Sequence, residues 1–493
     1  MQVSVLSTLH IERTFDMISG MTAVVDEWRT GADRACVPDV PPPALTADEV
    51  RRFRDRLLAA QVPTDATAQV ELLTALEELR RADMAVQASV ALELDETVRA
   101  GERAAARGGR TEERLGRGVP LQVGLATRTS PHRARVFLGA ARVWHTEMPC
   151  TLAALRAGVI DEYAATVLVR ETACLPLEAR RQVDRELCAD HGALDGVGVK
   201  RLVARARTLA ARLDPAAVVA RARKAETERT VTVRPAPDAM VYLTALLPVA
   251  QGVAAYAALK HAADTAPGDA SEAPRPRGQV MADTLVERLT GRSRAADVPV
   301  AVNLVVSDAT LLGAGHEPAQ VLDHSGAHHG VVPAQIAREL VACGLDEGAA
   351  WIRQLYADPA GRLVAATSAR RFFADGLAAL LRVRDQGICR TPYCDAPVRH
   401  LDHVVVHARG GATSLDNGQG LCEACNQAKN VDGFAQRVEP GGRHSVVTTT
   451  PTGHSYRSTA PPPPEPARPA VPDPVVEAES LVERAFERLL ARL

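Results

Sequence analysis

The chain has 493 residues, and at roughly 150 residues per domain this length indicates more than one domain. Hydrophobic residues make up 46% and aromatic residues only 3%, a composition that favours helices packed through Ala, Leu and Val. The 58 basic residues nearly balance the 60 acidic ones, which excludes a polycationic protein. Any contact with nucleic acid must therefore come from a local basic surface.

Residues 1–44 are expected to form an N-terminal extension that ends in a Pro-rich stretch. Glu12 and Arg13 interrupt the only early apolar run, so no signal-peptide pattern is present and we expect a cytoplasmic protein. The stretch 239–259 carries no charge, but Pro248 and Gly252 interrupt it. We interpret it as a buried strand followed by a helix, and we expect no membrane partner.

Residues 45–345 are predicted to form a helix-rich domain with a small β region. Thr46 and Glu49 have the spacing of a capping box at the start of a helix, and Ser130 followed by Pro131 is a second helix start. Residues 230–234 and 240–247 flank a Pro-containing turn and predict a β-hairpin, and alternation over 300–306 predicts another strand. The fold class is therefore mainly α with a small mixed β region.

Two helical regions are rich in basic residues. The first contains Arg133 and Arg135 and is followed by two short predicted helices, an arrangement that can form a helix-turn-helix and present arginines to DNA phosphates. The second, residues 200–229, can follow a phosphate backbone. A solvated face of a helical bundle is the simpler explanation of both regions, and the DNA-binding interpretation stays open beside it.

Four of the nine cysteines are clustered within 37 residues, whereas the others are scattered. Cys389 and Cys394 form one pair and Cys422 and Cys425 the other, and each pair has the spacing of thiolates on a tight turn. The odd total and the missing export signal indicate reduced thiols. We therefore predict a structural Zn²⁺ ion held by these four cysteines.

The residues between the two cysteine pairs predict a small ββα unit. Residues 400–406 have the pattern of a strand, 407–417 form a Gly-containing loop, and a helix is expected to begin near Asn426. A unit of this size buries too little apolar surface to fold alone, which gives a zinc clamp a physical purpose.

Four motifs together resemble the HNH endonuclease module of the ββα-metal type: Cys-x4-Cys, Asp402-His403, Gly-Gly-x-x-Ser-x-x-Asn and Leu-Cys-x-x-Cys-Asn-x-x-Lys. The wider chain, over residues 45–458, is similar to actinobacterial HNH proteins that carry a helix-rich N-terminal domain of unknown function. The nuclease motifs carry this resemblance more sharply than the helical part does.

The resemblance implies roles for individual residues. His403 matches the general base that takes a proton from the attacking water. Asp402 and Asn426 match the positions that hold one catalytic cation, Mg²⁺ or Mn²⁺, through oxygen atoms. Asn417 matches the residue that tethers the loop and orients the base, and Lys429 the one that neutralises a phosphate. Asn426 stands where many members of the family have His; an Asn carbonyl can also bind Mg²⁺, so the resemblance leaves metal affinity and preference open.

The charge around these motifs is balanced, with six basic and six acidic residues between Arg382 and Asp432. DNA affinity is therefore expected to come from Arg409 and Lys429 near the site and from Arg133 and Arg135 in the helical part. After the nuclease module, residues 346–458, we expect a Pro-rich linker over 459–474 and an amphipathic tail helix over 475–493. This helix either docks on the body of the protein or mediates homo-oligomerisation.

The function predicted from these motifs is that of a metal-dependent HNH endonuclease acting on the phosphodiester bonds of DNA. A zinc-stabilised nucleic-acid-binding module without hydrolytic activity is the alternative.

Overall fold

The computed structural model describes residues 45–105, 115–265, 275–292, 303–307, 310–311, 315–322, 328–346, 372–373 and 375–462. The predicted N-terminal extension, the tail helix and most of the Pro-rich linker lie outside the described residues. The chain divides into two compact units, of which the first consists mainly of residues up to Glu228 and the second mainly of residues from Arg229 onward. The domain boundaries proposed above remain predictions.

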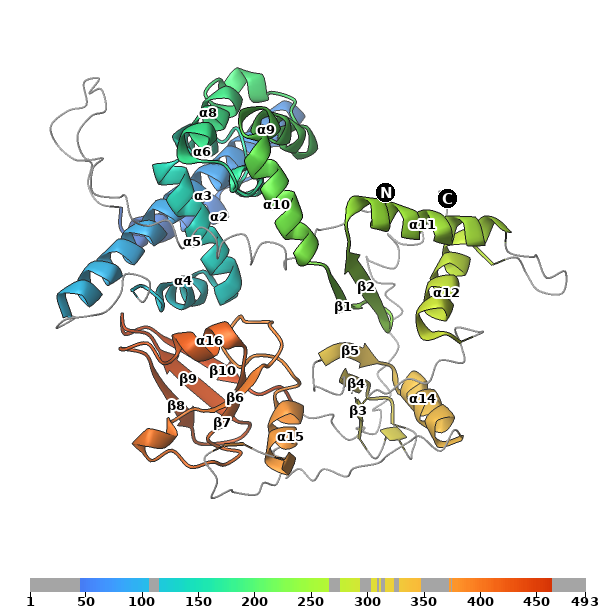
Figure 1. Cartoon of the computed structure of the whole chain (residues 1–493). Coiled ribbons are helices and arrows are strands. Elements are labelled where there is room, and N and C mark those ends of the chain that lie inside the picture. Colours follow the sequence, from blue (N-terminus) through green and yellow to red (C-terminus); the bar gives the residue numbers. More distant parts are fainter. Residues whose placement is uncertain are drawn as a thin grey trace. The chain divides into compact units, whose positions relative to one another are not determined.

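The described residues of the first unit up to Glu228 form helices and the turns between them (Figure 1). Short turns join most of them, as expected where consecutive helices pack against one another. They are α2 (Ala47–Ala59), α3 (Ala66–Ala105), α4 (Val119–Thr127), α5 (Pro131–Thr146), α6 (Pro149–Arg156), α7 (Glu162–Thr172), α8 (Leu177–Cys188), the 3-10 helix η3 (His191–Leu194), α9 (Val199–Leu213) and α10 (Pro215–Thr227).

Two predicted helix starts are confirmed in atomic detail. The backbone N–H of Glu49 donates to the Thr46 hydroxyl, and the backbone N–H of Thr46 donates to the Glu49 carboxylate over 2.8 Å, which completes the capping box of α2. At α5, the Ser130 hydroxyl accepts a hydrogen bond from the backbone N–H of Arg133 over 3.2 Å. Both caps satisfy amides that the first turn of a helix leaves without partners.

The core of this unit surrounds Trp144 of α5, which is fully buried and donates its indole N–H to the carbonyl of Ala165 over 3.3 Å. Alanines such as Ala88 and Ala140 are also fully buried there, so the helices approach closely with little side-chain bulk between them. The low aromatic content of the sequence is thus explained by an alanine-lined core.

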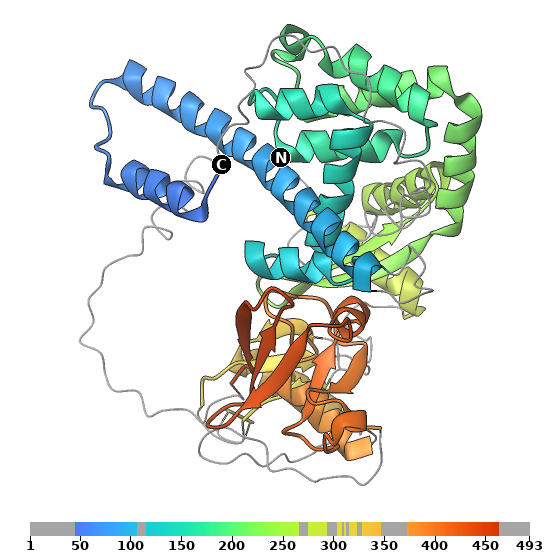
Figure 2. The same ribbon diagram turned by 90° about the vertical axis from the view of Figure 1, so that its left-hand side faces the viewer.

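The long helix α3 buries side chains against the unit only from about its middle onward, although Arg81 also donates to the carbonyls of Gly158 and Val159. Its buried residues begin at Ala85, whereas Leu73 and Leu76 are exposed and α2 has no buried residue. Figure 2 shows α2 and the N-terminal half of α3 extending away from the other helices of the unit.

The second unit begins with the hairpin of β1 (Thr230–Ala236) and β2 (Met240–Leu246), followed by α11 (Val249–Thr265) and α12 (Arg277–Thr290). The hairpin prediction is confirmed, but the predicted burial of this stretch is wrong, because Met240, Val241 and Val249 are all exposed. None of the described helices has the length and apolar character needed to cross a membrane.

A three-stranded antiparallel sheet follows, in the order β3 (Asn303–Val305), β4 (Ala319–Leu322) and β5 (His328–Val332). β3 occupies the predicted strand over 300–306. Helix α14 (Ala334–Asp346) continues the chain, and Ala337 from this helix is buried with Ala319 and Val332 of the sheet.

The C-terminal module contains the predicted ββα arrangement. Its elements are α15 (Asp375–Arg384), β6 (His400–His403), the 3-10 helix η5 (His407–Arg409), β7 (Gly418–Leu421), α16 (Glu423–Ala428), β8 (Ala435–Glu439), β9 (Ser445–Thr449) and β10 (Ser455–Thr459). β6 and β7 pair antiparallel, and β8, β9 and β10 form a second antiparallel sheet with β9 in the middle. Helix α16 begins at Glu423, three residues before the predicted start near Asn426.

Candidate active site and metal centre

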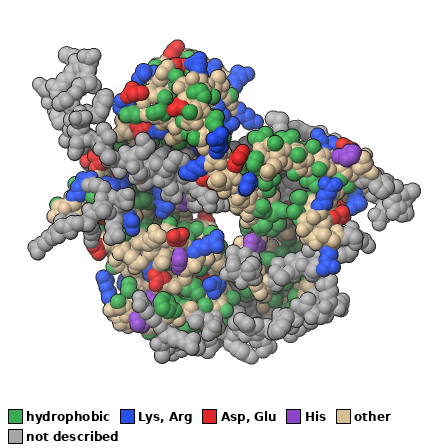
Figure 3. Space-filling view, viewed as in Figure 1, with side chains coloured by type: hydrophobic (Ala, Val, Ile, Leu, Met, Phe, Trp, Pro, Cys, Tyr) green, Lys and Arg blue, Asp and Glu red, His purple; other side chains and the backbone are tan. Residues whose placement is uncertain are grey.

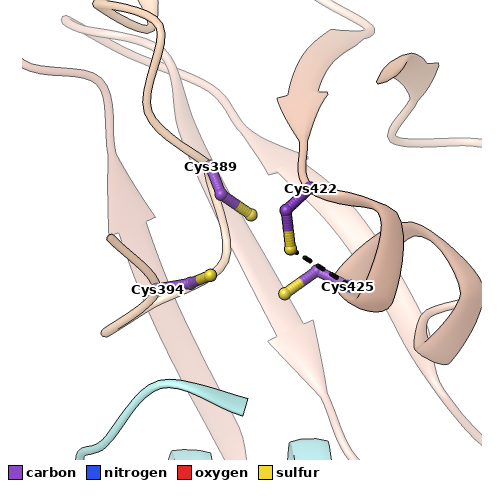
Figure 4. Close-up of side chains that lie close together, drawn as sticks. All are labelled: Cys389, Cys394, Cys422 and Cys425. Carbon is purple, nitrogen blue, oxygen red and sulfur yellow. Dashed lines mark hydrogen bonds between the residues drawn. The ribbon is translucent and has the colours of Figure 1, made fainter. Parts of the chain in front are cut away.

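The sulfur atoms of Cys389, Cys394, Cys422 and Cys425 all lie within 4.8 Å of one another, and all four residues are buried (Figure 4). A zinc ion bound to four thiolates at about 2.3 Å would separate the sulfurs by about 3.8 Å, so the cluster needs only a small closure around an ion. The predicted convergence of the four cysteines is therefore confirmed, and the donor set fits Zn²⁺.

Local backbone structure brings each cysteine pair to this point. Cys389 and Cys394 lie on a turn in which Tyr393 adopts a left-handed conformation, with φ of 63°, and the backbone N–H of Cys389 donates to the carbonyl of Ala396 over 2.9 Å. On the other side, Cys422 precedes α16 and its sulfur accepts the backbone N–H of Cys425 over 3.5 Å (Figure 4). Two short turns thus face each other across the candidate metal centre.

Asp402 and His403 form the end of β6, and His403 pairs with Gly418 of β7. Because the strand ends at His403, the two side chains are not held on opposite faces. The backbone N–H of His403 donates to Asp402 Oδ1 over 2.8 Å, and His403 Nδ1 lies 3.8 Å from the same oxygen. The imidazole therefore presents its Nδ1 edge toward the carboxylate.

The imidazole of His403 is held on its other sides by residues that the sequence reasoning did not identify. His403 is only 6% exposed, and its Nε2 lies 2.9 Å from the hydroxyl oxygen of Thr413, within hydrogen-bond distance. The ring of Phe373 lies 4.6 Å from the imidazole between centroids, and that of His407 lies 5.6 Å away. These contacts fix the orientation of the ring.

Asn417 ties the loop after β6 to the strand that follows it. Its Oδ1 accepts the backbone N–H of Val405 over 2.8 Å, while its Nδ2 donates to the carbonyls of Val405 and Ala412 over 3.0 and 2.8 Å. A Cβ atom at Gly411 would lie 1.8 Å from the Val405 carbonyl oxygen, so this close approach requires glycine. Asn417 thus bridges the two ends of this loop, and its predicted role in orienting the base stays a prediction.

A buried charged cluster joins α15 to the β strands of the module. The carboxylate of Asp385 accepts the backbone N–H of Gly420 over 2.7 Å and two hydrogen bonds from Arg384 over 2.8 and 3.0 Å. Arg390 Nε lies 3.6 Å from the same carboxylate, and its guanidinium also donates to the carbonyls of His444 and Ser458. This cluster connects the cysteine turn, β7 and the β8–β10 sheet.

Burial changes the proton affinity of two members of this region. It lowers the pKa of Arg390 to about 10, although the nearby Asp385 carboxylate opposes the shift. It also lowers the pKa of His444 to about 4, and the positive charges of Arg384 and Arg390 lower it further. His444 Nε2 lies 2.9 Å from the carbonyl oxygen of Asp416, where a neutral imidazole can donate its N–H.

The other predicted site residues lie in different settings. Asn426 is half-buried within α16, directly after Cys425. Lys429 follows the end of α16 and is 9% exposed, whereas Arg409 in η5 is exposed. Arg133 and Arg135 are exposed on α5 in the first unit.

The roles of Thr413, Asp385 and His444 were not predicted, because no strong sequence motif specifies these residues. Thr413 falls between Gly411 and Asn417 in a loop whose motif drew attention to Ser414 instead. Asp385 lies 35 residues from its partner Gly420, and His444 lies 28 residues from its partner Asp416, so no local spacing connects them to the site. Only the folded chain reveals these contacts.

Two protein families match the chain. Residues 70–385 match the domain of unknown function DUF222, which covers more than half of the chain, and residues 389–432 match the HNH endonuclease domain. The second match contains both cysteine pairs, Asp402, His403 and Asn417. No curated protein and no solved structure matches the chain. The chain therefore belongs to the DUF222 family and carries an HNH endonuclease domain after its helix-rich domain of unknown function.

Proposed function

We propose that this protein hydrolyses phosphodiester bonds of DNA, with His403 as general base and one divalent cation, Mg²⁺ or Mn²⁺, held by Asp402 and Asn426. The observation that carries the proposal is the arrangement at the end of β6, where an oriented imidazole lies 3.8 Å from a carboxylate oxygen inside the part of the chain that matches HNH endonucleases. Carboxylate and amide oxygens are the donors that Mg²⁺ and Mn²⁺ prefer.

We infer different tasks for the two ring nitrogens of His403 from their contacts. In the tautomer whose Nε2–H donates to the Thr413 hydroxyl, Nδ1 on the Asp402 side carries the lone pair that takes the proton from water. Phe373 and the tether of Asn417 keep the ring in this orientation. The bound cation would stabilise negative charge on the leaving oxygen of the phosphodiester.

The cluster of four cysteine sulfurs favours a structural Zn²⁺ ion that holds the two cysteine-bearing turns of the module together. We expect the purified chain to carry one equivalent of zinc, measured by chelator release. Replacing Cys422 with Ser should remove the zinc, whereas replacing the distant Cys174 with Ser should leave the zinc content unchanged.

The phosphates of the substrate are proposed to contact Arg409 next to the site and Arg133 and Arg135 on α5, all of which are exposed. Lys429 is buried, so its ammonium would meet a phosphate at the base of the site rather than at its surface. The tail helix over 475–493 and its role in homo-oligomerisation stay predictions outside the described residues.

The low exposure of His403 favours a second candidate, a zinc-stabilised nucleic-acid-binding module without hydrolysis. Nicking of supercoiled plasmid, titrated with Mg²⁺ and Mn²⁺, separates the two. We expect metal-dependent nicking by the wild type and none by His403→Ala, while the control His400→Ala on the exposed part of β6 cleaves normally. DNA binding without nicking by the wild type would support the second candidate.

A further inference from the structure

Helix α9 of the helical unit carries charge of one sign only. Its 15 residues contain no acidic side chain, although the whole chain has a net charge of -2. Together with α10, residues 199–227 hold eight basic residues against the acidic residues Asp214 and Glu226. The basic residues of α9, here called the α9 cationic face, are Lys200, Arg201, Arg205, Arg207 and Arg212.

The charge lies on the side of α9 that faces away from the core. Leu202, Ala206 and Ala210 are buried in the core of the helical unit, whereas all five basic residues are exposed. At about 100° per residue, Arg201, Arg205 and Arg212 fall in one row along the helix. Figure 3 shows Lys and Arg side chains (blue) on the exposed surface of the helical unit around this helix.

Part of this face is available to an anionic ligand. Arg207 pairs with Glu171 and Arg212 with Glu186, each over 2.9 Å. Among the described residues, by contrast, no acidic side chain pairs with Lys200, Arg201 or Arg205, and Arg205 contacts only the carbonyl of Ala193 over 3.3 Å. Three exposed cations at one end of α9 thus have no carboxylate that neutralises them within the described chain.

The row has dimensions that suit a duplex. From Arg201 to Arg212, whose ion pair with Glu186 is itself solvent-exposed, it extends about 16 Å at a rise of about 1.5 Å per residue. This length corresponds to about five steps of a DNA strand at about 3.4 Å each. Arginine is also the side chain that contacts phosphate oxygens in a two-pronged geometry.

We propose that the α9 cationic face binds the phosphate backbone of duplex DNA and gives the helix-rich domain a substrate-binding task. The inference rests on the proposed function, in that DNA is the substrate. It supplies what the HNH domain lacks, because the basic and acidic residues around the nuclease motifs are equal in number. Contacts of this kind position the duplex without reading its sequence.

The test compares two triple variants in the His403→Ala background, which prevents cleavage during binding. The first is Lys200→Gln, Arg201→Gln and Arg205→Gln, and the matched control is Arg51→Gln, Arg52→Gln and Arg56→Gln on the exposed helix α2. Both remove three positive charges, and Gln preserves helix propensity. Binding to a fluorescent 30-base-pair duplex is measured by anisotropy over a range of salt concentrations, and circular dichroism checks that the helices remain.

We expect the α9 variant to bind more weakly than the control and to do so equally for unrelated duplex sequences. Its plot of log affinity against log salt should be less steep by about 2 to 3, because each lost phosphate contact contributes about 0.9 to the slope. An α9 variant with the affinity and slope of the control overturns the proposal. So does an α9 variant that binds a 30-base-pair RNA duplex more weakly but binds the DNA duplex as the control does.

Failure of this inference is distinguishable from failure of the proposed function. Metal-dependent nicking by the wild type together with unchanged binding by the α9 variant overturns the α9 assignment alone. If the wild type nicks no DNA but its DNA binding depends on the α9 cationic face, the α9 assignment is supported and the proposed hydrolysis is refuted.

Discussion

The buried carboxylate of Asp385 is predicted to be the main polar support of the nuclease module. Replacing it with Ala removes the acceptor for the Gly420 N–H and the counter-charge for Arg384 and Arg390, whose side chains are 8% and 3% exposed. Two guanidinium groups would then remain in the interior without a carboxylate. Breaking a buried pair in this way costs about 3 to 5 kcal/mol.

The expected magnitude follows from the number of bonds that Asp385 makes. Asp385→Asn keeps an oxygen acceptor for Gly420 but loses the charge, so its effect should be smaller than that of Asp385→Ala. Arg384 retains its hydrogen bonds to the carbonyls of Leu415 and Gly418, which limits the loss. A cost of about 3 to 5 kcal/mol corresponds to an opening equilibrium larger by roughly two to four powers of ten.

Amide hydrogen exchange of the intact protein measures this local stability. Peptides from β6 and β7 should lose protection by about a hundredfold or more in Asp385→Ala, while peptides from α8 in the helical unit keep theirs. Asp416→Ala, an exposed aspartate nearby, is the control and should change stability by less than about 0.5 kcal/mol. A loss of protection below tenfold at β7 would refute the assigned role of Asp385.

Two further predictions concern the site and its pH response. Thr413→Val removes the hydroxyl that holds His403 Nε2 and should lower kcat for cleavage about 5- to 30-fold with little change in KM. Thr413→Ser keeps a hydroxyl and should retain the wild-type kcat. Equal kcat in all three proteins would contradict the role of Thr413 in holding the imidazole. Burial, aided by the charges of Arg384 and Arg390, lowers the pKa of His444 from 6.5 to about 4 in the folded protein. Between these two pH values the unfolded state therefore binds more protons than the folded state. The free energy of unfolding should fall as the pH drops from about 6.5 to 4. Thermal unfolding of His444→Gln should show a weaker loss over this range, and an identical pH dependence would count against the assignment.

Features that depend on neighbouring residues were predictable from the sequence. The capping box of Thr46 and Glu49 requires only a separation of three residues, and the β1–β2 hairpin requires only two apolar runs around a turn. The convergence of the four cysteines was predictable because each pair lies on one short turn. Asp402, His403 and Asn417 were found because they belong to motifs that a resemblance could identify.

Contacts between segments far apart in the chain were decided by the tertiary structure. Asp385 meets Gly420, and Arg390 meets Ser458, 68 residues later, so no local pattern could pair them. The hydroxyl of Thr413 reaches His403 only because the tethered loop returns to the end of β6. The exposure of Met240 and Val249 was likewise beyond the sequence, since an apolar run shows what can be buried but not whether a partner surface covers it.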